Sequence, residues 1–175
     1  MYGGGGGEAR VLYHGTSLEA ILAIQESGFR VDLSGTNAGA ALGPGVYVTT
    51  TLQKALNYAK REGVPGKEPN PAAGGVFELE VDLGRCYTVR SAAGPRRTTR
   101  AERTGWASQG YDSAWAAAGI IGEMEEHCIR DPARVRITNV VLGNTGEARR
   151  LGYVVRNGRL EVSAEFVREQ QRRLL

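Results

Sequence analysis

The pattern of apolar and polar positions predicts several short β-strands. Residues 76–82 alternate cleanly, with large apolar residues on one side and two glutamates on the other, as in a half-buried strand. Shorter apolar runs predict further strands at residues 10–13, 46–49, 127–129 and 135–142. Residues 153–155 and 160–162 flank Asn157-Gly158, and an Asn-Gly pair between apolar runs predicts a tight hairpin.

Three segments carry helix signals. A Thr-x-x-Glu capping box that begins at Thr16, followed by apolar residues at helical spacing, predicts a helix over residues 17–27. The same spacing, with Gln in place of Glu, begins at Thr50 and predicts a second helix that ends near residue 62. A short helix is expected over residues 164–174.

The remaining segments are rich in small or polar residues and predict loops, at residues 33–45, 63–75 and 91–105. Strands and helices do not alternate regularly, which favours an α+β fold built on antiparallel sheets. Residues 1–8 form a Gly-rich leader that we expect to be flexible. We expect one domain over residues 9–175, ending in the hairpin and the last helix.

Composition and charge narrow the class of protein. The chain has 175 residues, of which 41% are hydrophobic, so it can bury a real core. Its net charge of +3 is compatible with a polyanionic ligand but does not require one. Cys86 and Cys128 form no paired motif, which weakly favours a reducing, intracellular location, cytoplasmic or nuclear. The longest nearly apolar stretch, residues 114–122, is far below the ~20 residues of a membrane helix, so we expect a soluble protein.

Three short segments hold residues suited to chemistry. His14 ends a predicted strand and enters a turn with Gly15, where a ligand could approach the backbone closely. Tyr47 and Tyr58 lie on a strand and on the following helix, and such a pair can sandwich a flat ring. Glu126 begins an apolar strand, where a buried carboxylate is costly without a purpose. Taken singly, each has an ordinary explanation: a turn histidine, two core tyrosines and a solvated charge run.

In this order and spacing, the segments resemble the catalytic domain of PARP-like ADP-ribosyltransferases with a His-Tyr-Glu triad, in a short, single-domain form. The resemblance runs from about residue 11 to residue 142. It rests on Tyr-His-Gly-Thr at 13–16, Gly-x-Gly-Val-Tyr at 43–47, Lys-Ala-x-Asn-Tyr at 54–58 and Glu-x-x-Ile-x-Asp at 126–131. It implies the ADP-ribosyltransferase fold, in which two packed, mainly antiparallel sheets enclose a cleft that binds NAD⁺.

The resemblance also implies a role for each matching residue. His14 would hydrogen-bond the adenosine-side ribose, and Gly15 would hold the nicotinamide carboxamide through its backbone. Tyr47 and Tyr58 would stack on the nicotinamide ring. Glu126 would accept a hydrogen bond from the 2′-OH of the nicotinamide ribose and stabilise an oxocarbenium-like transition state. The expected catalytic residues are therefore His14, Tyr47 and Glu126, with NAD⁺ as co-substrate and no metal.

Two features complicate this assignment. Thr16 and Ala55 complete the implied NAD⁺-binding set, but the family commonly has at position 55 a serine that bonds the carboxamide. Loss of one neutral hydrogen bond is worth about 0.5–1.5 kcal/mol, so we expect weaker NAD⁺ binding. In addition, Glu123, Glu125 and Glu126 crowd together, and a one-residue slip would turn a different carboxylate inward. Glu126 is preferred because it keeps the spacing to the Ile-x-Asp pair.

Loops and partners follow from the same resemblance. Residues 32–41 correspond to the loop that covers NAD⁺ in the family. The basic stretch 96–103 could meet acidic or nucleic-acid acceptors, although a solvated basic loop is its simpler explanation. We expect a monomer without membrane contact that modifies a protein or nucleic-acid acceptor, with the chain itself as one candidate. The triad is compatible with poly(ADP-ribose) formation.

Two other functions stay open. A catalytically silent module that binds NAD⁺ or ADP-ribose is favoured by Ala55, whereas the complete set of triad residues argues against it. RNA 2′-phosphotransferases also carry a His-Gly-Thr-like turn and use NAD⁺. They rely on further Arg and His residues to grip the RNA phosphate, and this chain has only two histidines, His14 and His127.

Overall fold

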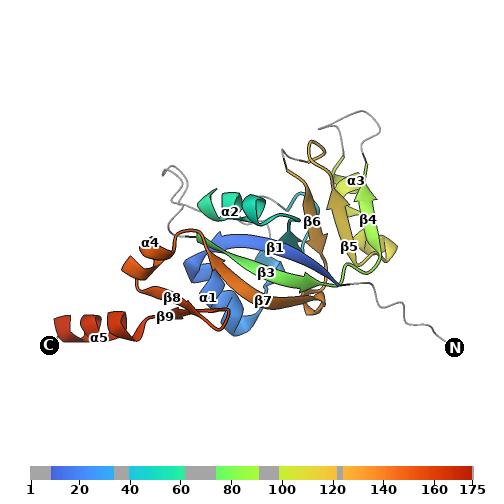
Figure 1. The fold of residues 1–175 in the computed structure, drawn as a ribbon. Coiled ribbons are helices and arrows are strands. Elements are labelled where there is room, and N and C mark those ends of the chain that lie inside the picture. Colours follow the sequence, from blue (N-terminus) through green and yellow to red (C-terminus); the bar gives the residue numbers. More distant parts are fainter. Residues whose placement is uncertain (1–8, 34–39, 62–73, 91–98, 122–123, 175) are drawn as a thin grey trace.

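The computed structural model describes residues 9–33, 40–61, 74–90, 99–121 and 124–174, whose strands form two main sheets and a hairpin (Figure 1). The first sheet is antiparallel, with the order β1 (Arg10–Ser17), β3 (Gly74–Val81) and β7 (Val135–Leu142). The second has the order β2 (Val46–Val48), β6 (Glu126–Ile129), β5 (Ser113–Ala116) and β4 (Cys86–Val89). Its β4–β5 pair is parallel and its other pairs are antiparallel. The expected α+β fold of mainly antiparallel sheets is confirmed.

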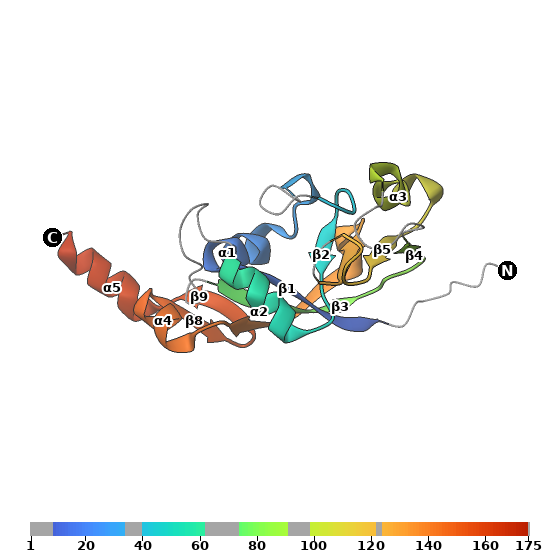
Figure 2. The ribbon, with the colours of Figure 1, turned by 90° about the horizontal axis from the view of Figure 1, so that it is seen from above.

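Helices lie around and beyond these sheets. They are α1 (Leu18–Ser27), α2 (Leu52–Arg61), α3 (Arg100–Thr104), α4 (Thr145–Arg150) and α5 (Ala164–Arg173), with 3₁₀ turns at Val31–Leu33, Ala107–Gln109 and Pro132–Arg134. The hairpin consists of β8 (Tyr153–Arg156) and β9 (Arg159–Val162). From it, α5 extends away from the sheets and has no buried residue (Figures 1 and 2).

Two consecutive glycines let helices pack closely on both faces of the first sheet. A Cβ on Gly74 would lie 2.6 Å from the carbonyl oxygen of Ala59 in α2. A Cβ on Gly75 would lie 2.7 Å from the side chain of Ile21 in α1. Because successive strand residues point to opposite faces, α2 covers one face of β3 and α1 covers the other.

The predicted turn at His14-Gly15-Thr16 is wrong, because β1 continues through all three residues. His14 pairs with Phe77 and Gly15 pairs with Val76 in the antiparallel register. The small residues that indicated a turn instead make room for a helix. A Cβ on Gly15 would lie 1.8 Å from the carbonyl oxygen of Ala55 in α2.

Both helices begin as predicted to within two residues, but with different caps. Thr16 is still part of β1, so Ser17 is the N-cap of α1 and its hydroxyl accepts from the backbone N–H of Ala20. For α2, the hydroxyl of Thr51 accepts from the backbone N–H of Lys54. Thr50 is not the cap because its hydroxyl donates to a carboxylate of the candidate site described below.

The C-terminal elements agree with the sequence pattern. The hairpin turn has φ of 49° at Asn157 and 74° at Gly158, the two positive values that its turn type requires. Strand β7 has the predicted bounds. The terminal helix ends at Arg173, one residue earlier than expected.

Several short elements were not predicted. Strands β4 and β5 have four residues each, and small or polar residues interrupt the large apolar residues in both. Helix α3 lies inside the segment expected to be a loop, and Thr99 and Glu102 form its complete capping box. Asn144 caps α4 in the same manner, by accepting from the backbone N–H of Glu147. The capping residues of both helices are typical N-cap residues, but each helix is too short to show an apolar period.

Parts of other predictions lie outside the described residues. These are the leader at residues 1–8, residues 34–39 of the proposed NAD⁺-covering loop, residues 63–73 of the second loop, residues 96–98 of the basic stretch, and the predicted helix end near residue 62.

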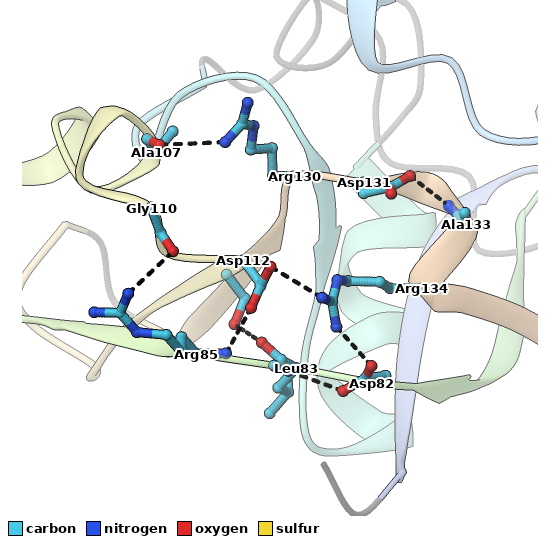
Figure 3. A network of polar contacts seen from close by, with 12 residues as sticks. Asp82, Leu83, Arg85, Ala107, Gly110, Asp112, Arg130, Asp131, Ala133 and Arg134 are labelled. Atoms are coloured by element: carbon cyan, nitrogen blue, oxygen red, sulfur yellow. Dashed lines mark hydrogen bonds and ion pairs between the residues drawn. The ribbon is translucent and has the colours of Figure 1, made fainter. Parts of the chain in front are cut away.

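Among the described residues, polar contacts join the two sheets at both ends. At one end, the backbones of Tyr13 in β1 and Thr49 after β2 exchange two hydrogen bonds, each of 2.9 Å. At the other end, Arg134 pairs with Asp82 at 2.5 Å and with Asp112 at 3.0 Å (Figure 3). Asp112 also accepts from the backbone N–H of Arg85 at 2.8 Å. The first connection brings β1 alongside β2, where the candidate site lies.

Candidate active site

His14 is fixed against β2 by the bridge between the sheets. Its Nδ1 lies 2.7 Å from the backbone oxygen of Tyr47. A carbonyl oxygen can only accept, so Nδ1 carries the proton and, in the neutral ring, Nε2 is the acceptor nitrogen. The ring also meets Phe29 edge to face, with centroids 5.2 Å apart. The first two triad residues of the prediction are thus direct neighbours.

Tyr47 is held at both ends. Its hydroxyl donates to the backbone oxygen of Gly43 at 2.7 Å and accepts from the backbone N–H of Leu42 at 3.0 Å. Burial raises the pKa of this phenol, and the neighbouring Cys128 adds to the rise. Burial likewise raises the pKa of the Cys128 thiol to about 12. Both groups therefore remain neutral at physiological pH.

Glu126 lies on the same side of the second sheet as Tyr47. Tyr47 pairs with Cys128 across β2 and β6, and Glu126 is two residues before Cys128, so the three side chains share one face. The hydroxyl of Tyr58, on α2, donates to Glu126 Oε1 at 2.6 Å. Burial raises the pKa of Glu126, the Tyr58 hydrogen bond opposes the rise, and the charge of Glu125 adds to it. The Glu126 carboxyl therefore holds its proton more readily than an exposed glutamate does.

Glu125 has a very different environment. Its Oε1 accepts from the hydroxyl of Thr49 at 2.8 Å and from the backbone N–H and hydroxyl of Thr50 at 2.9 and 2.8 Å. Its Oε2 accepts from Trp115 Nε1 at 3.1 Å. Burial alone would raise the pKa of Glu125, but the nearby His127 ring, 3.5 Å away, and the hydrogen bonds from Thr50 and Thr49 outweigh burial and hold the pKa well below its usual range.

The two neighbouring glutamates are thus distinguished by their contacts. From the described residues, Glu125 accepts four hydrogen bonds, whereas Glu126 accepts one. Glu125 is saturated by the protein, and Glu126 keeps capacity for a ligand hydroxyl. Glu123 lies outside the described residues. The donors to Glu125 were missed in the sequence, where the Thr49-Thr50-Thr51 run was interpreted only as a strand end and a helix cap.

Gly15, Thr16 and Ala55 are packed inside the protein. Gly15 is required by the approach of α2, whose backbone fills the space that its Cβ would occupy. Ala55 is fully buried on that helix, and Thr16 is buried too. The sequence predicts that a ligand approaches Gly15 closely, but on the Cβ side of Gly15 it is α2 that does so.

The open pocket found on the surface lies elsewhere. It has a volume of about 240 Å³ between β7, α4 and β8 and is lined by Val140, Leu142, Thr145, Arg149, Tyr153, Val154 and Val155. Arg149 is its one charged lining residue. Because the triad residues are absent from its lining, its position says nothing about their chemistry.

Two further features concern metals and membranes. Within the described ranges, no group of three or more His, Cys, Asp or Glu side chains could hold a metal ion. None of the helices in that part of the chain is both long and apolar enough to cross a membrane.

Comparison with known proteins identifies the family. Residues 5–118 match the poly(ADP-ribose) polymerase catalytic domain, which is well over half of the chain and includes His14, Tyr47 and Tyr58. The match ends before Glu126, so the assignment of the carboxylate rests on the motif and on the contacts above. No curated protein matches the chain. The family match and the α+β fold together show that the chain belongs to the poly(ADP-ribose) polymerase catalytic domain family.

Proposed function

We propose that the chain cleaves the nicotinamide–ribose bond of NAD⁺ and transfers ADP-ribose to an acceptor, with Glu126 as the key carboxylate. The observation that carries this proposal is the hydrogen bond of 2.6 Å between Tyr58 and Glu126, on the face of the second sheet that also holds Tyr47. One half-buried carboxylate with spare acceptor capacity thus lies beside two aromatic rings. Membership of the family makes NAD⁺ the natural ligand for this arrangement.

His14 and the two tyrosines would bind and orient the dinucleotide. The imidazole of His14 is held by the backbone oxygen of Tyr47, which fixes its position relative to β2. In this proposal the imidazole bonds the adenosine-side ribose, and Tyr47 and Tyr58 stack on the nicotinamide. Preorganised binding of this kind lowers the entropic cost of reaching the transition state.

Glu126 would act on the ribose itself. Departure of nicotinamide leaves the anomeric carbon electron-poor, and a carboxylate that accepts from the adjacent 2′-OH stabilises the developing positive charge. Only the ionised carboxylate can do so. An ordinary glutamate has a pKa of about 4.3, and burial raises the pKa of Glu126. As the pH is lowered, activity should therefore begin to fall at a higher pH than it would with an ordinary glutamate.

The acceptor step would use the same carboxylate. After nicotinamide has left, Glu126 can accept a hydrogen bond from an incoming nucleophile and take its proton as the new glycosidic bond forms. We propose a protein or nucleic-acid acceptor, with the chain itself as the first to test. Formation of a polymer requires, in addition, that the acceptor be ADP-ribose already transferred.

A test uses labelled NAD⁺ with wild-type protein and Glu126→Gln, the products being separated by size. Loss of one preorganised contact to developing charge costs about a hundred- to a thousandfold in rate, so Glu126→Gln should give almost no label. The matched control is Glu161→Gln, an exposed glutamate of β9, which should label like wild type. One shifted band indicates single transfer and a ladder indicates polymer. Equal labelling by Glu126→Gln and wild type would refute the role of Glu126.

A second candidate, a silent NAD⁺- or ADP-ribose-binding module, is favoured by one observation. Position 55 is an alanine and is fully buried, so its side chain offers no hydrogen bond to a carboxamide. Calorimetric titration with NAD⁺, combined with detection of free nicotinamide, separates the two functions. Binding without nicotinamide release supports the module and contradicts the transferase.

A further inference from the structure

Glu125 contacts several of the segments that carry the candidate site. Its hydrogen-bond donors come from the end of β2, through Thr49 and Thr50, and from β5, through Trp115. Lys54 in the first turn of α2 and His127 in β6 also reach it, each at 3.5 Å. The Glu125 side chain is only 12% exposed. One carboxylate thus connects four elements of the chain.

These contacts bear on each residue of the proposed triad. Glu126 is the next residue, at the first position of β6, so the fixed Glu125 side chain determines how the chain enters that strand. Thr49, which donates to Glu125, exchanges backbone hydrogen bonds with Tyr13, and this bridge sets His14 beside Tyr47.

Helix α2 is held on the same side. Lys54 and Tyr58 are four residues apart, so they project from one face of the helix. Lys54 reaches Glu125, and Tyr58 donates to Glu126. The two adjacent carboxylates are therefore engaged by successive turns of one helix.

We infer that Glu125 is a positioning residue, which holds the Glu126 carboxylate and the Tyr58 hydroxyl in the geometry that transfer requires. It does not touch NAD⁺, because its own oxygens are engaged by the protein. This inference rests on the proposed function.

The decisive variant is Glu125→Gln. The glutamine amide has the size of the carboxylate, but its N–H group would face the hydrogen-bond donors that surround position 125. The hydrogen bonds that hold this side chain should therefore weaken. We expect kcat for nicotinamide release to fall about ten- to a hundredfold, as displacements near 1 Å do, while the Kd for NAD⁺ stays within about threefold of wild type.

A pH profile separates positioning from a purely structural role. The groups that face Glu126 are Tyr58 from α2, Tyr47 from β2, and Cys128 and Glu125 from its own segment, with Lys54 and His127 beyond Glu125. The negative charge of Glu125 raises the pKa of Glu126. Glu125→Gln should therefore move the acid limb of kcat to lower pH. Glu125→Asp keeps the charge and shortens the reach, so kcat should fall while the limb stays in place.

The control for lost stability is Ser113→Ala, at the opposite end of β5, which removes a buried hydrogen bond of 2.6 Å to the Leu83 oxygen. If Glu125→Gln does not fold, Glu125→Asp and Trp115→Phe supply the same comparison. Wild-type kcat in the Glu125 variants, together with an acid limb of Glu125→Gln that stays at the wild-type pH, would overturn the inference alone, provided that these variants are no more stable than Ser113→Ala. A wild-type protein that releases no nicotinamide would overturn the proposed function and this inference with it.

Discussion

Two adjacent glutamates, Glu125 and Glu126, differ in pKa and in hydrogen bonding because their surroundings differ. Among the described residues, Glu125 has four hydrogen-bond donors and a lowered pKa, whereas Glu126 is half-buried, has a raised pKa and has one donor, Tyr58. The sequence alone pointed to Glu126 through its motif, but it could not exclude a one-residue slip. The distinction depends on Thr49 and Thr50, which are far from Glu125 in the sequence, and on Trp115, and no sequence pattern links these three residues to Glu125.

Tyr58→Phe tests the environment of Glu126 at this scale. Phenylalanine keeps the ring for stacking and removes the hydroxyl that donates to Glu126 at 2.6 Å. That hydrogen bond lowers the pKa of Glu126, so its loss raises the pKa further. The acid limb of kcat should therefore move to higher pH, opposite to the shift expected for Glu125→Gln. Hydrogen bonds to charged groups are worth about 1.5–3 kcal/mol, which sets the largest shift at about two pH units.

Tyr153→Phe, on the remote strand β8, is the control for this experiment and should leave the profile unchanged. If the acid limb of kcat in Tyr58→Phe lies at the same pH as in wild type, Tyr58 does not influence the ionisation of Glu126.

At the scale of elements, the packing of α2 on β1 creates the site. The sequence predicted both elements, but it placed a turn where β1 continues, since Gly15 and its small neighbours are typical of turns. Only the three-dimensional contact explains Gly15, because the atoms that exclude a side chain there belong to Ala55, forty residues later. Strands β4 and β5 were missed because small and polar residues, such as Thr88, Ser113 and Ala114, interrupt their large apolar residues.

Gly15→Ala tests this packing. The new methyl group would meet the Ala55 backbone at 1.8 Å, so α2 must shift away from β1. Overpacking of this kind typically costs about 1–3 kcal/mol of unfolding free energy, measured by chemical denaturation, and a contact with backbone falls at the upper end. Nicotinamide release should fall as well, because α2 carries Tyr58.

The matched control is Gly146→Ala in α4, where the nearest atom lies 3.5 Å from the new Cβ. Alanine in a helix is favoured over glycine by about 0.5–1 kcal/mol, so this variant should be as stable as wild type or more so. Equal stability of the two variants would show that α2 does not rest on Gly15.

At the scale of the whole molecule, the site belongs to the two sheets and α2, and the C-terminal elements stand apart from it. Tyr47, Tyr58 and Phe29, which contact His14 or Glu126, come from β2, α2 and the segment after α1, whereas α5 extends away from the sheets (Figure 2). The order of strands in each sheet was not predictable from the sequence, because pairing depends on contacts between distant segments. The single domain over residues 9–175 stays a prediction.

Truncation after Ser163 tests this separation. Helix α5 has no buried residue, and its Phe166 ring rests against Gly152. Partial exposure of one aromatic ring should lower the unfolding free energy by at most about 2 kcal/mol. The rate of nicotinamide release per folded molecule should stay within about twofold of wild type, because no group of α5 reaches the site. A truncated protein that folds but releases no nicotinamide would show that α5 belongs to the catalytic unit.

The central claim is that Glu126 acts on NAD⁺ already held by other residues. The most direct measurement compares the Kd for NAD⁺ with the rate of nicotinamide release at saturating NAD⁺, in wild type and in Glu126→Gln. The account predicts a Kd within a few-fold of wild type and a rate reduced about a hundredfold or more. An unchanged rate, or a loss of binding that fully explains the lost rate, would contradict it.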